Sequence, residues 1–296
     1  VLTSAYTNPE LKDKDNIKQT YLFRSAQVNT GNIIMKTKNL EVEYINQLTS
    51  IGSCNKGFIF FDCRPYLSAK ANTLKGAGID NKNDYSNCID LIYGCIENIH
   101  AVRKSLKKAT EKILYGNSTS EDGKIKSEED NIKETRFMSK FDETKWQEYL
   151  SDIICSGVTV ANYMLKQINV ICHCSDGWDR TSQICSLAQL ILDPYYRTIE
   201  GFAVLIEKDW VSFGHQFAIR NGCDIRPDKF KERSPIFIQF LHVVYQLMVQ
   251  YPTAFEFKQN LLIFLTDEIY SNKYGTFLFN NEKELNQNKA KFNTIR

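Results

Sequence analysis

The amino-acid sequence predicts an α/β fold in which a central sheet is flanked by helices. Two short apolar runs, at 58–61 and 168–174, are bounded by turn-forming or polar residues, as buried strands are. The longer segments around them repeat apolar residues at the helical period. Because these strands and helices intermingle without strict alternation, we expect a single domain over residues 1–296.

The spacing of apolar residues indicates where the elements lie. The first thirty-odd residues are polar and irregular. A long helix is expected to begin near Asp84, because apolar residues from Tyr85 to Ile99 would share one of its faces. Its basic C-terminal end, at 103–108, would suit the helix dipole. The other helices are expected at 40–51, 146–167, 182–192, 235–247 and 254–270.

Composition and charge exclude several classes of protein. With 43% hydrophobic and 24% charged residues, the chain is neither disordered nor fibrous. Its 37 basic and 35 acidic residues give a net charge of +2, which argues against a general nucleic-acid binder. No apolar run approaches the roughly 20 residues of a membrane span. Nine Cys, an odd number without a regular framework, predict reduced thiols in a cytoplasmic compartment.

Two further features concern the extent of the domain. Residues 116–135 carry almost no large apolar side chain, which predicts an exposed, mobile loop rather than a domain linker. The chain begins with Val1, without an initiator Met or a signal-peptide pattern. We therefore expect it to be a piece of a longer protein whose flanking domains lie outside this sequence.

The chemistry is concentrated in residues 170–181, Val-Ile-Cys-His-Cys-Ser-Asp-Gly-Trp-Asp-Arg-Thr. An apolar strand runs into a short loop bracketed by Cys174 and Arg180, and a helix follows at once. Such a corner directs successive backbone N–H groups into one concavity above the positive end of the helix, a geometry that binds phosphate. Arg180 adds a planar guanidinium that can hold two phosphate oxygens.

The same positive field acts on the thiol of Cys174, which we expect to ionise readily and to attack a bound phosphorus in line. Thr181 can hydrogen-bond the sulfur and ease its later departure. A Cys with Arg six positions on is by itself a weak signal, although no other Cys of this chain has one. The alternative, a buried structural thiol beside an Arg–Asp pair, is disfavoured by the strand, the helix and the flexible Ser175 and Gly177.

Residues 173–181, His-Cys-Ser-Asp-Gly-Trp-Asp-Arg-Thr, resemble the signature of the myotubularin phosphoinositide 3-phosphatases. The resemblance covers roughly residues 20–280 in register, apart from 116–135. Further stretches that resemble the family are 61–65, 71–76, 98–100, 195–199, 207–215, 233–235 and 252–257. Several ordered motifs at once make this a specific signal.

The resemblance implies a cysteine-dependent, protein tyrosine phosphatase-like fold that works without metal or cofactor. The implied substrates are phosphatidylinositol 3-phosphate and phosphatidylinositol 3,5-bisphosphate, cleaved at the 3-position. The implied partners are these lipids at the surface of endosomal-type membranes, and other family members in homo- or hetero-oligomers. The lipid-binding domain of the PH-GRAM type that usually precedes the phosphatase domain is not in this chain. Two alternatives remain: a protein tyrosine or dual-specificity phosphatase, and a non-catalytic lipid-binding scaffold subunit.

The resemblance also assigns roles to site residues. It places the acid that protonates the leaving inositol oxygen at Asp179, with Asp176 as its rival; beside a bound dianion we expect this acid to have a raised pKa. Alternatively, Asp179 only pairs with Arg180. Trp178 either lines the inositol ring or packs on the loop. The remaining residues that it places near the bound phosphate or headgroup are Ser175, Gly177, Asn72, Lys75, Asn98 and Arg220.

Two positions depart from the family pattern. Gln216 stands where the family usually has Arg, about one helical turn before Arg220. Loss of this cation would weaken binding of the bisphosphate roughly ten- to hundredfold, because a charge-assisted hydrogen bond contributes about 1.5–3 kcal/mol. Cys172 stands where an apolar residue is usual, and we interpret it as a buried small hydrophobe in preference to a strained disulfide with Cys174.

Overall fold

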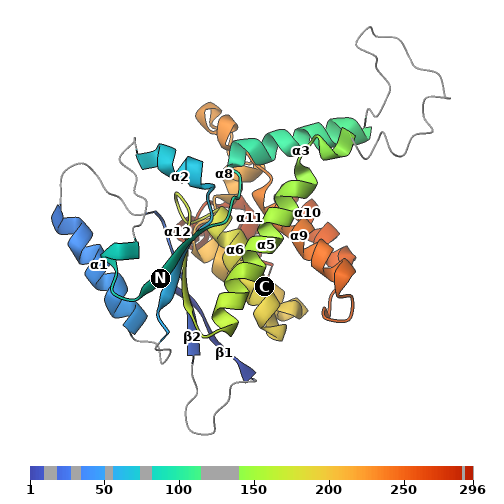
Figure 1. The fold of residues 1–296 in the computed structure, drawn as a ribbon. Coiled ribbons are helices and arrows are strands. Elements are labelled where there is room, and N and C mark those ends of the chain that lie inside the picture. The colour runs from blue at the N-terminus through green and yellow to red at the C-terminus, as the bar shows by residue number, and fades with distance from the viewer. Residues whose placement is uncertain are drawn as a thin grey trace.

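The computed structural model describes residues 1–9, 19–27, 35–50, 56–73, 82–114, 140–288 and 291–295 (Figure 1). Its described strands form one sheet in the order β1-β2-β5-β3-β4. β1 runs antiparallel to β2, whereas β2, β5, β3 and β4 are mutually parallel. The strands are β1 (Leu2–Thr7), β2 (Gln19–Ser25), β3 (Phe58–Asp62), β4 (Cys88–Tyr93) and β5 (Asn169–His173).

Helices cover both faces of this sheet. α1 (Met35–Ser50) lies on one face, and α5 (Trp146–Leu165), α6 (Arg180–Leu192) and α9 (Ile236–Gln250) lie on the other (Figure 1). The remaining helices are α2 (Tyr66–Thr73), α3 (Ile99–Leu114), α7 (Ile199–Ile206), α8 (Phe217–Asn221), α10 (Gln259–Ser271), α11 (Gly275–Leu278) and α12 (Glu282–Asn288). Shorter helical turns are η2 (Lys82–Asp84), η4 (Pro194–Arg197), the π-helical η5 (Glu207–Ser212) and η6 (Pro227–Glu232).

The two central strands are buried throughout and mainly apolar, because helices cover both of their sides. Every residue of β3 and of β5 is buried. On the α1 face Phe23, Phe58, Phe60 and Ile171 form a small aromatic cluster with Tyr85. The larger core lies on the other face, between the sheet and α5, α6, α7, α9 and α10. The mixed α/β class with a central sheet flanked by helices is confirmed.

The structure confirms most of the expected elements. The runs at 58–61 and 168–174 are strands β3 and β5. The helices expected at 40–51, 146–167, 182–192 and 235–247 correspond to α1, α5, α6 and α9. α10 begins only at Gln259, five residues after the position expected. The loop expected at 116–135 lies outside the described residues.

The helix expected from Asp84 is wrong in its first half. Cys88–Tyr93 form edge strand β4, which pairs with β3, and the helix begins only at Ile99. The apolar residues fit a helical period, but Ile89 and Ile92 are β-branched and a buried strand offers them a partner. Gly94 follows the last residue of the strand. A larger residue does not fit there, since a Cβ would lie 2.8 Å from the Phe61 ring.

The described part of the polar N-terminal region contains strands β1 and β2. β1 and β2 form a hairpin-like antiparallel pair, and β2 continues the parallel sheet beside β5. Buried positions in β2 include a charged residue, Arg24, which is 2% exposed. A buried charge interrupts the apolar pattern from which strands are predicted.

The described parts of the chain contain no helix long and apolar enough to span a bilayer. Their eight cysteines are all free thiols. Cys172 is fully buried, and its Sγ lies 3.5 Å from that of Cys63. Burial raises the pKa of the Cys172 thiol well above its ordinary value, which agrees with an inert, buried side chain.

Close packing of α5 on α6 depends on a glycine. A Cβ at Gly157 of α5 would fall 2.6 Å from Cγ of the buried Leu187 in α6. We predict that Gly157→Ala lowers the free energy of unfolding by about 1–3 kcal/mol, because the two helices must move apart. Urea unfolding measures this. Val158→Ala, at a 39% exposed position of the same helix, is the control and should change stability by less than about 0.5 kcal/mol. Equal stability of Gly157→Ala and the wild type would contradict the prediction.

Candidate active site

The loop between β5 and α6 lies at the carboxyl edge of the parallel strands, where open α/β sheets bind ligands. β5 ends at His173 and α6 begins at Arg180. Cys174 is 2% exposed, and its sulfur accepts a hydrogen bond from the Gly177 N–H at 3.3 Å. Gly177 has φ +83°, and a Cβ there would lie 2.7 Å from the Ser25 carbonyl oxygen. The tight loop therefore needs glycine at this position.

Three carbonyl groups of the loop are held from outside. The Ser175 carbonyl accepts from the Gln27 N–H at 3.1 Å, and the Gly177 carbonyl accepts from Arg24 Nη2 at 2.7 Å. The Trp178 carbonyl accepts from Ser182 Oγ at 3.0 Å. In a trans peptide the following N–H points opposite to the carbonyl. The amides after these three carbonyls are thus turned toward the loop interior, the arrangement that binds an anion.

Arg24 is the strongest of these outside supports, and the sequence reasoning missed it. Its guanidinium donates to Oδ1 of Asp209 at 3.0 Å, to the Asp209 carbonyl at 2.8 Å and to Ser182 Oγ at 2.8 Å. It also lies over the ring of Phe213, 4.1 Å from the centroid. Asp209 is fully buried. The sequence feature that could have revealed this residue is its position directly after the apolar run Tyr-Leu-Phe.

Arg180 and Thr181 open α6 beside the loop. The Arg180 guanidinium donates to Ser175 Oγ at 3.2 Å and to the Ile96 carbonyl at 3.4 Å. It therefore crosses from the loop to the segment after β4. Thr181 is fully buried, and its hydroxyl has no hydrogen-bond partner within the described chain. This hydroxyl is thus available to a sulfur or phosphate oxygen in the loop.

Asp179 is engaged by two basic side chains. Its carboxylate accepts from Arg220 Nε at 3.1 Å and from Arg220 Nη2 at 2.8 Å. Nδ1 of His215 lies 3.1 Å from Oδ1. Burial acts to raise the pKa of Asp179, but the hydrogen bond from His215 and the charge of Arg220 outweigh it and hold the pKa well below its ordinary value. The partner of Asp179 is therefore Arg220, not Arg180, and the expected raised pKa is not found here.

Asp176 has the opposite electrostatics. Its side chain is more exposed than that of Asp179 and is not held by an ion pair among the described contacts. Desolvation by the surrounding loop raises its pKa, and the charge of Asp179 adds to this effect. The charges of Arg220 and Arg180 oppose it without cancelling it. The two carboxylates of the loop thus have pKa values shifted in opposite directions, a pattern typical of acid–base sites.

The residues expected near the headgroup are only partly brought together. Arg220 is 5% exposed and lies against the loop through Asp179. Gln216 precedes it by one turn of α8, as expected, and its carbonyl accepts from the Arg220 N–H. Asn98 caps α3, since its Oδ1 accepts from the N–H groups of His100 and Ala101. The side chain of Asn72, at the end of α2, and all of Lys75 lie outside the described residues.

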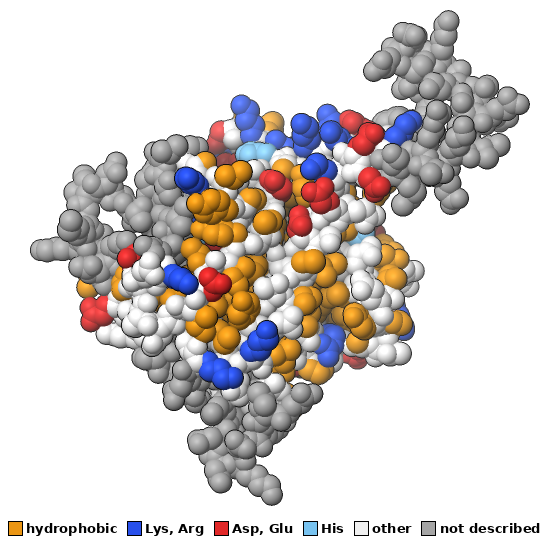
Figure 2. Space-filling view, in the orientation of Figure 1, with side chains coloured by type: hydrophobic (Ala, Val, Ile, Leu, Met, Phe, Trp, Pro, Cys, Tyr) orange, Lys and Arg blue, Asp and Glu red, His pale blue; other side chains and the backbone are white. Residues whose placement is uncertain are grey.

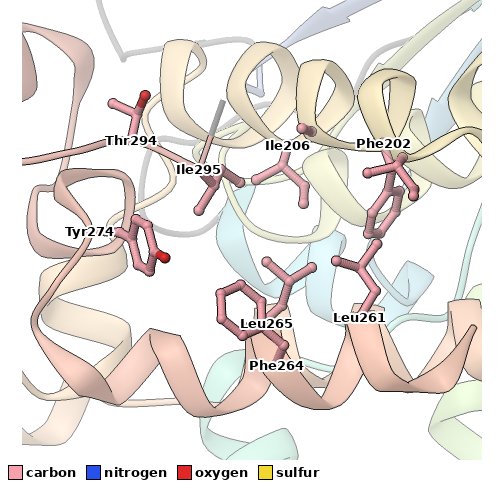
Figure 3. A pocket seen from close by; sticks show the side chains of 10 residues that line it. Phe202, Ile206, Leu261, Phe264, Leu265, Tyr274, Thr294 and Ile295 are labelled. Atoms are coloured by element: carbon pink, nitrogen blue, oxygen red, sulfur yellow. The ribbon is translucent and has the colours of Figure 1, made fainter. Parts of the chain in front are cut away.

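An apolar cavity of about 280 Å³ lies away from this loop, between α7 and α10 (Figure 3). Its lining includes Phe202, Ile206, Leu265 and Ile295, and none of its ten lining residues is charged. The cavity shares no residue with the loop. Because its lining residues carry no charge, it does not fit an anionic ligand. Within the described ranges no group of three or more His, Cys, Asp or Glu is placed to hold a metal ion.

The corner between β5 and α6 places a cysteine and an arginine around a loop with inward-facing amides, an arrangement suited to an anionic ligand. Comparison with known protein families identifies the class of protein. The model of the myotubularin-like phosphatase domain matches residues 10–286, and the chain belongs to this family.

Curated relatives agree with this assignment. Myotubularin of Xenopus laevis is 37% identical over 277 residues, which are 93% of this chain and 43% of that protein. Phosphatidylinositol-3,5-bisphosphate 3-phosphatase MTMR2 of Bos taurus is 38% identical over 267 residues, 90% of this chain and 39% of that protein. The chain thus spans about two fifths of the length of these relatives.

The ion pair of Asp179 predicts a pH dependence of stability. Because the folded-state pKa lies below that of an unfolded Asp, about 3.9, the pair stabilises the fold above that pH and is lost as the pH falls further. We predict that Asp179→Asn lowers the free energy of unfolding by about 3 kcal/mol at pH 7. The difference from the wild type should shrink as the pH falls from about 4 toward 2.

Urea unfolding across this pH range measures the effect, with Asp228→Asn as control. The Asp228 side chain is 71% exposed and lies 4.0 Å from Lys229. That variant should follow the wild type at every pH. Parallel curves for Asp179→Asn and the wild type would show that the carboxylate is not selectively stabilised in the folded protein.

Proposed function

We propose that this protein hydrolyses the 3-phosphate of phosphoinositide lipids, with phosphatidylinositol 3-phosphate as the principal substrate. The observation that carries the proposal is the cradle itself: Cys174 lies within a loop whose carbonyls are held outward and whose mouth is crossed by Arg180. Family membership supports it, as does the printed activity of MTMR2 on a 3-phosphorylated lipid. A protein tyrosine phosphatase-like fold is part of this proposal.

The reaction has two displacements. The Cys174 thiolate attacks phosphorus in line, the S–P bond forms, and the bond from phosphorus to the inositol 3-oxygen breaks. The leaving oxygen takes a proton from a carboxylic acid of the loop. Water then attacks the cysteinyl phosphate and gives a proton to the carboxylate that the first step left, the S–P bond breaks, and inorganic phosphate leaves. The free hydroxyl of Thr181 donates to the departing sulfur, while Arg180 and the inward amides hold the equatorial oxygens.

We assign the proton donor to Asp176. Its pKa is raised and, among the described residues, its carboxyl is not committed to an ion pair, so it holds a proton more readily than Asp179 does. Asp179 is held as a carboxylate by Arg220 and His215, which makes it an anchor for Arg220. Asp179 becomes the donor only if Arg220 leaves it for a substrate phosphate. Asp179 is the donor that the family resemblance implies.

The inositol ring and its other phosphates lie beyond the loop mouth in this proposal. Arg220 supplies one cation beside the loop, and Trp178 offers a half-buried aromatic ring. Asn72, Lys75 and Asn98 are proposed as further headgroup contacts by resemblance. Gln216 brings no charge one turn before Arg220. We therefore propose that the monophosphate is turned over more efficiently than the 3,5-bisphosphate.

Phosphate release from a panel of substrates tests the function. The panel contains short-chain lipids phosphorylated at the 3-, 4-, 5- and 3,5-positions and one phosphotyrosine peptide. We predict release confined to 3-phosphorylated lipids, about ten- to hundredfold faster for the monophosphate, since Gln216 lacks the second charge. Cys174→Ser should abolish it, because the nucleophile is removed.

Three outcomes would contradict this proposal. Turnover retained in Cys174→Ser would exclude the cysteinyl-phosphate mechanism. Faster release from the phosphotyrosine peptide than from any lipid would indicate a protein phosphatase. Lipid binding without any release would indicate a scaffold subunit.

The proton donor is tested by comparing leaving groups. The p-nitrophenolate released from p-nitrophenyl phosphate leaves without protonation, whereas the inositol oxygen must be protonated to leave. We predict that Asp176→Asn lowers kcat on the 3-phosphorylated lipid about 10²–10⁴-fold and has little effect on the aryl phosphate. It should also remove the basic limb of the pH–rate profile of the lipid. Asp179→Asn is the matched comparison; if it shows this selectivity instead, Asp179 is the donor.

A further inference from the structure

Two large apolar side chains are unusually exposed in this protein. Ile225 is 84% exposed and Leu67 is 77% exposed, the highest values among the large hydrophobic side chains of the described residues. Phe230, in the same segment as Ile225, is 46% exposed, less than several other apolar side chains. Single exposed apolar residues need no explanation, but the most exposed ones of a domain become informative when they share one region.

All three lie at the carboxyl edge of the sheet, beside the candidate active site. Leu67 is in the first turn of α2, directly after β3, whose extension bonds to β5 through the Cys63 N–H and the His173 carbonyl. Ile225 and Phe230 belong to the segment 222–234 between α8 and α9. α8 supplies Arg220, which is bound to the loop carboxylate Asp179.

The segment 222–234 is fastened to its surroundings. Arg220 Nη1 donates to the Glu232 carbonyl at 3.0 Å, and Arg103 of α3 donates to the Lys231 carbonyl at 2.6 Å. The Arg233 guanidinium lies 4.2 Å from the centre of the Phe230 ring. The exposed side chains are therefore presented at a defined position relative to the loop.

Basic side chains adjoin these apolar ones. α3 continues from Arg103 with exposed Lys104, Lys107 and Lys108, of which Lys107 lies 3.7 Å from Glu111. Lys and Arg side chains, with some Asp and Glu among them, lie along the upper part of Figure 2. Segment 222–234 carries four basic residues and three acidic ones: Asp224 pairs with Arg226, Glu232 pairs with Lys229, and the exposed Asp228 lies 4.0 Å from Lys229. The region thus combines isolated apolar side chains with an excess of positive charge.

We propose that these residues form a membrane-docking surface: Leu67, Ile225 and Phe230 enter the interfacial region of a bilayer while Lys104, Lys107 and Lys108 contact anionic lipid headgroups. Apolar side chains beside lysines are the composition that binds such an interface. This inference rests on the proposed function, because a lipid substrate must reach Cys174 while its acyl chains stay in the bilayer. Docking at this edge turns the mouth of the loop toward the headgroups.

The test compares one substrate presented in two ways. The variant Ile225→Ser/Phe230→Ser is assayed on phosphatidylinositol 3-phosphate in vesicles of phosphatidylcholine and phosphatidylserine, and on its water-soluble short-chain form. We expect kcat/KM on vesicles to fall about tenfold or more, because two apolar side chains that enter the bilayer are lost. Turnover of the soluble form should be unchanged. The matched control is Val249→Ser/Ile263→Ser, at positions 58% and 54% exposed on α9 and α10, and it should behave as the wild type.

Vesicle sedimentation separates this inference from the proposed function. Wild-type protein should sediment with the mixed vesicles, less with phosphatidylcholine alone and less at high salt, and the Ile225→Ser/Phe230→Ser variant should remain in solution. This result supports docking even if no substrate is turned over. Equal vesicle binding and equal vesicle turnover by the variant and the wild type would overturn the inference. An equal loss on soluble and vesicle substrate would also overturn it, because the residues would then act on the site itself.

Discussion

The buried ion pair between Arg24 and Asp209 is the interaction on which the candidate site depends. Arg24 comes from β2 and Asp209 from the π-helical turn η5, and the same guanidinium binds the Gly177 carbonyl of the loop and Ser182 of α6. Charges buried this deeply are tolerated only when paired and fully hydrogen-bonded. The network therefore joins four elements, and it shapes the anion cradle before any ligand binds.

A second ion pair gives the loop its chemical asymmetry. Arg220 and His215 hold Asp179 ionised, and the resulting negative charge helps to raise the pKa of Asp176. His215 is itself placed by ring contacts with Trp210 and Phe217 in the core. Through the Glu232 carbonyl, Arg220 also positions the segment that carries Ile225 and Phe230. One cation thus connects acid–base chemistry within the loop to the proposed membrane-facing edge.

Local sequence was sufficient to predict a strand or helix wherever that element has a strong apolar pattern of its own. β3 and β5 were predicted from their short apolar runs, and α5, α6 and α9 from apolar residues that recur at the helical period. It was insufficient at the sheet margins. β4 has a single strand partner and carries apolar residues that also fit a helix, and β2 contains the buried charge of Arg24. In both cases the sheet decided the conformation.

The sequence by itself determined the proposed reactive loop: Cys174, Arg180 and Thr181 lie within one short segment, and the strand before it and the helix after it bring them together. Only the tertiary structure decided which residues hold that loop and what charge its carboxylates carry. The partner of Asp179 lies 41 positions away, and the partner of Arg24 lies 185 positions away. Periodicity reports on neighbours within a turn or a strand, whereas a pKa depends on every charge that folding brings within a few ångströms.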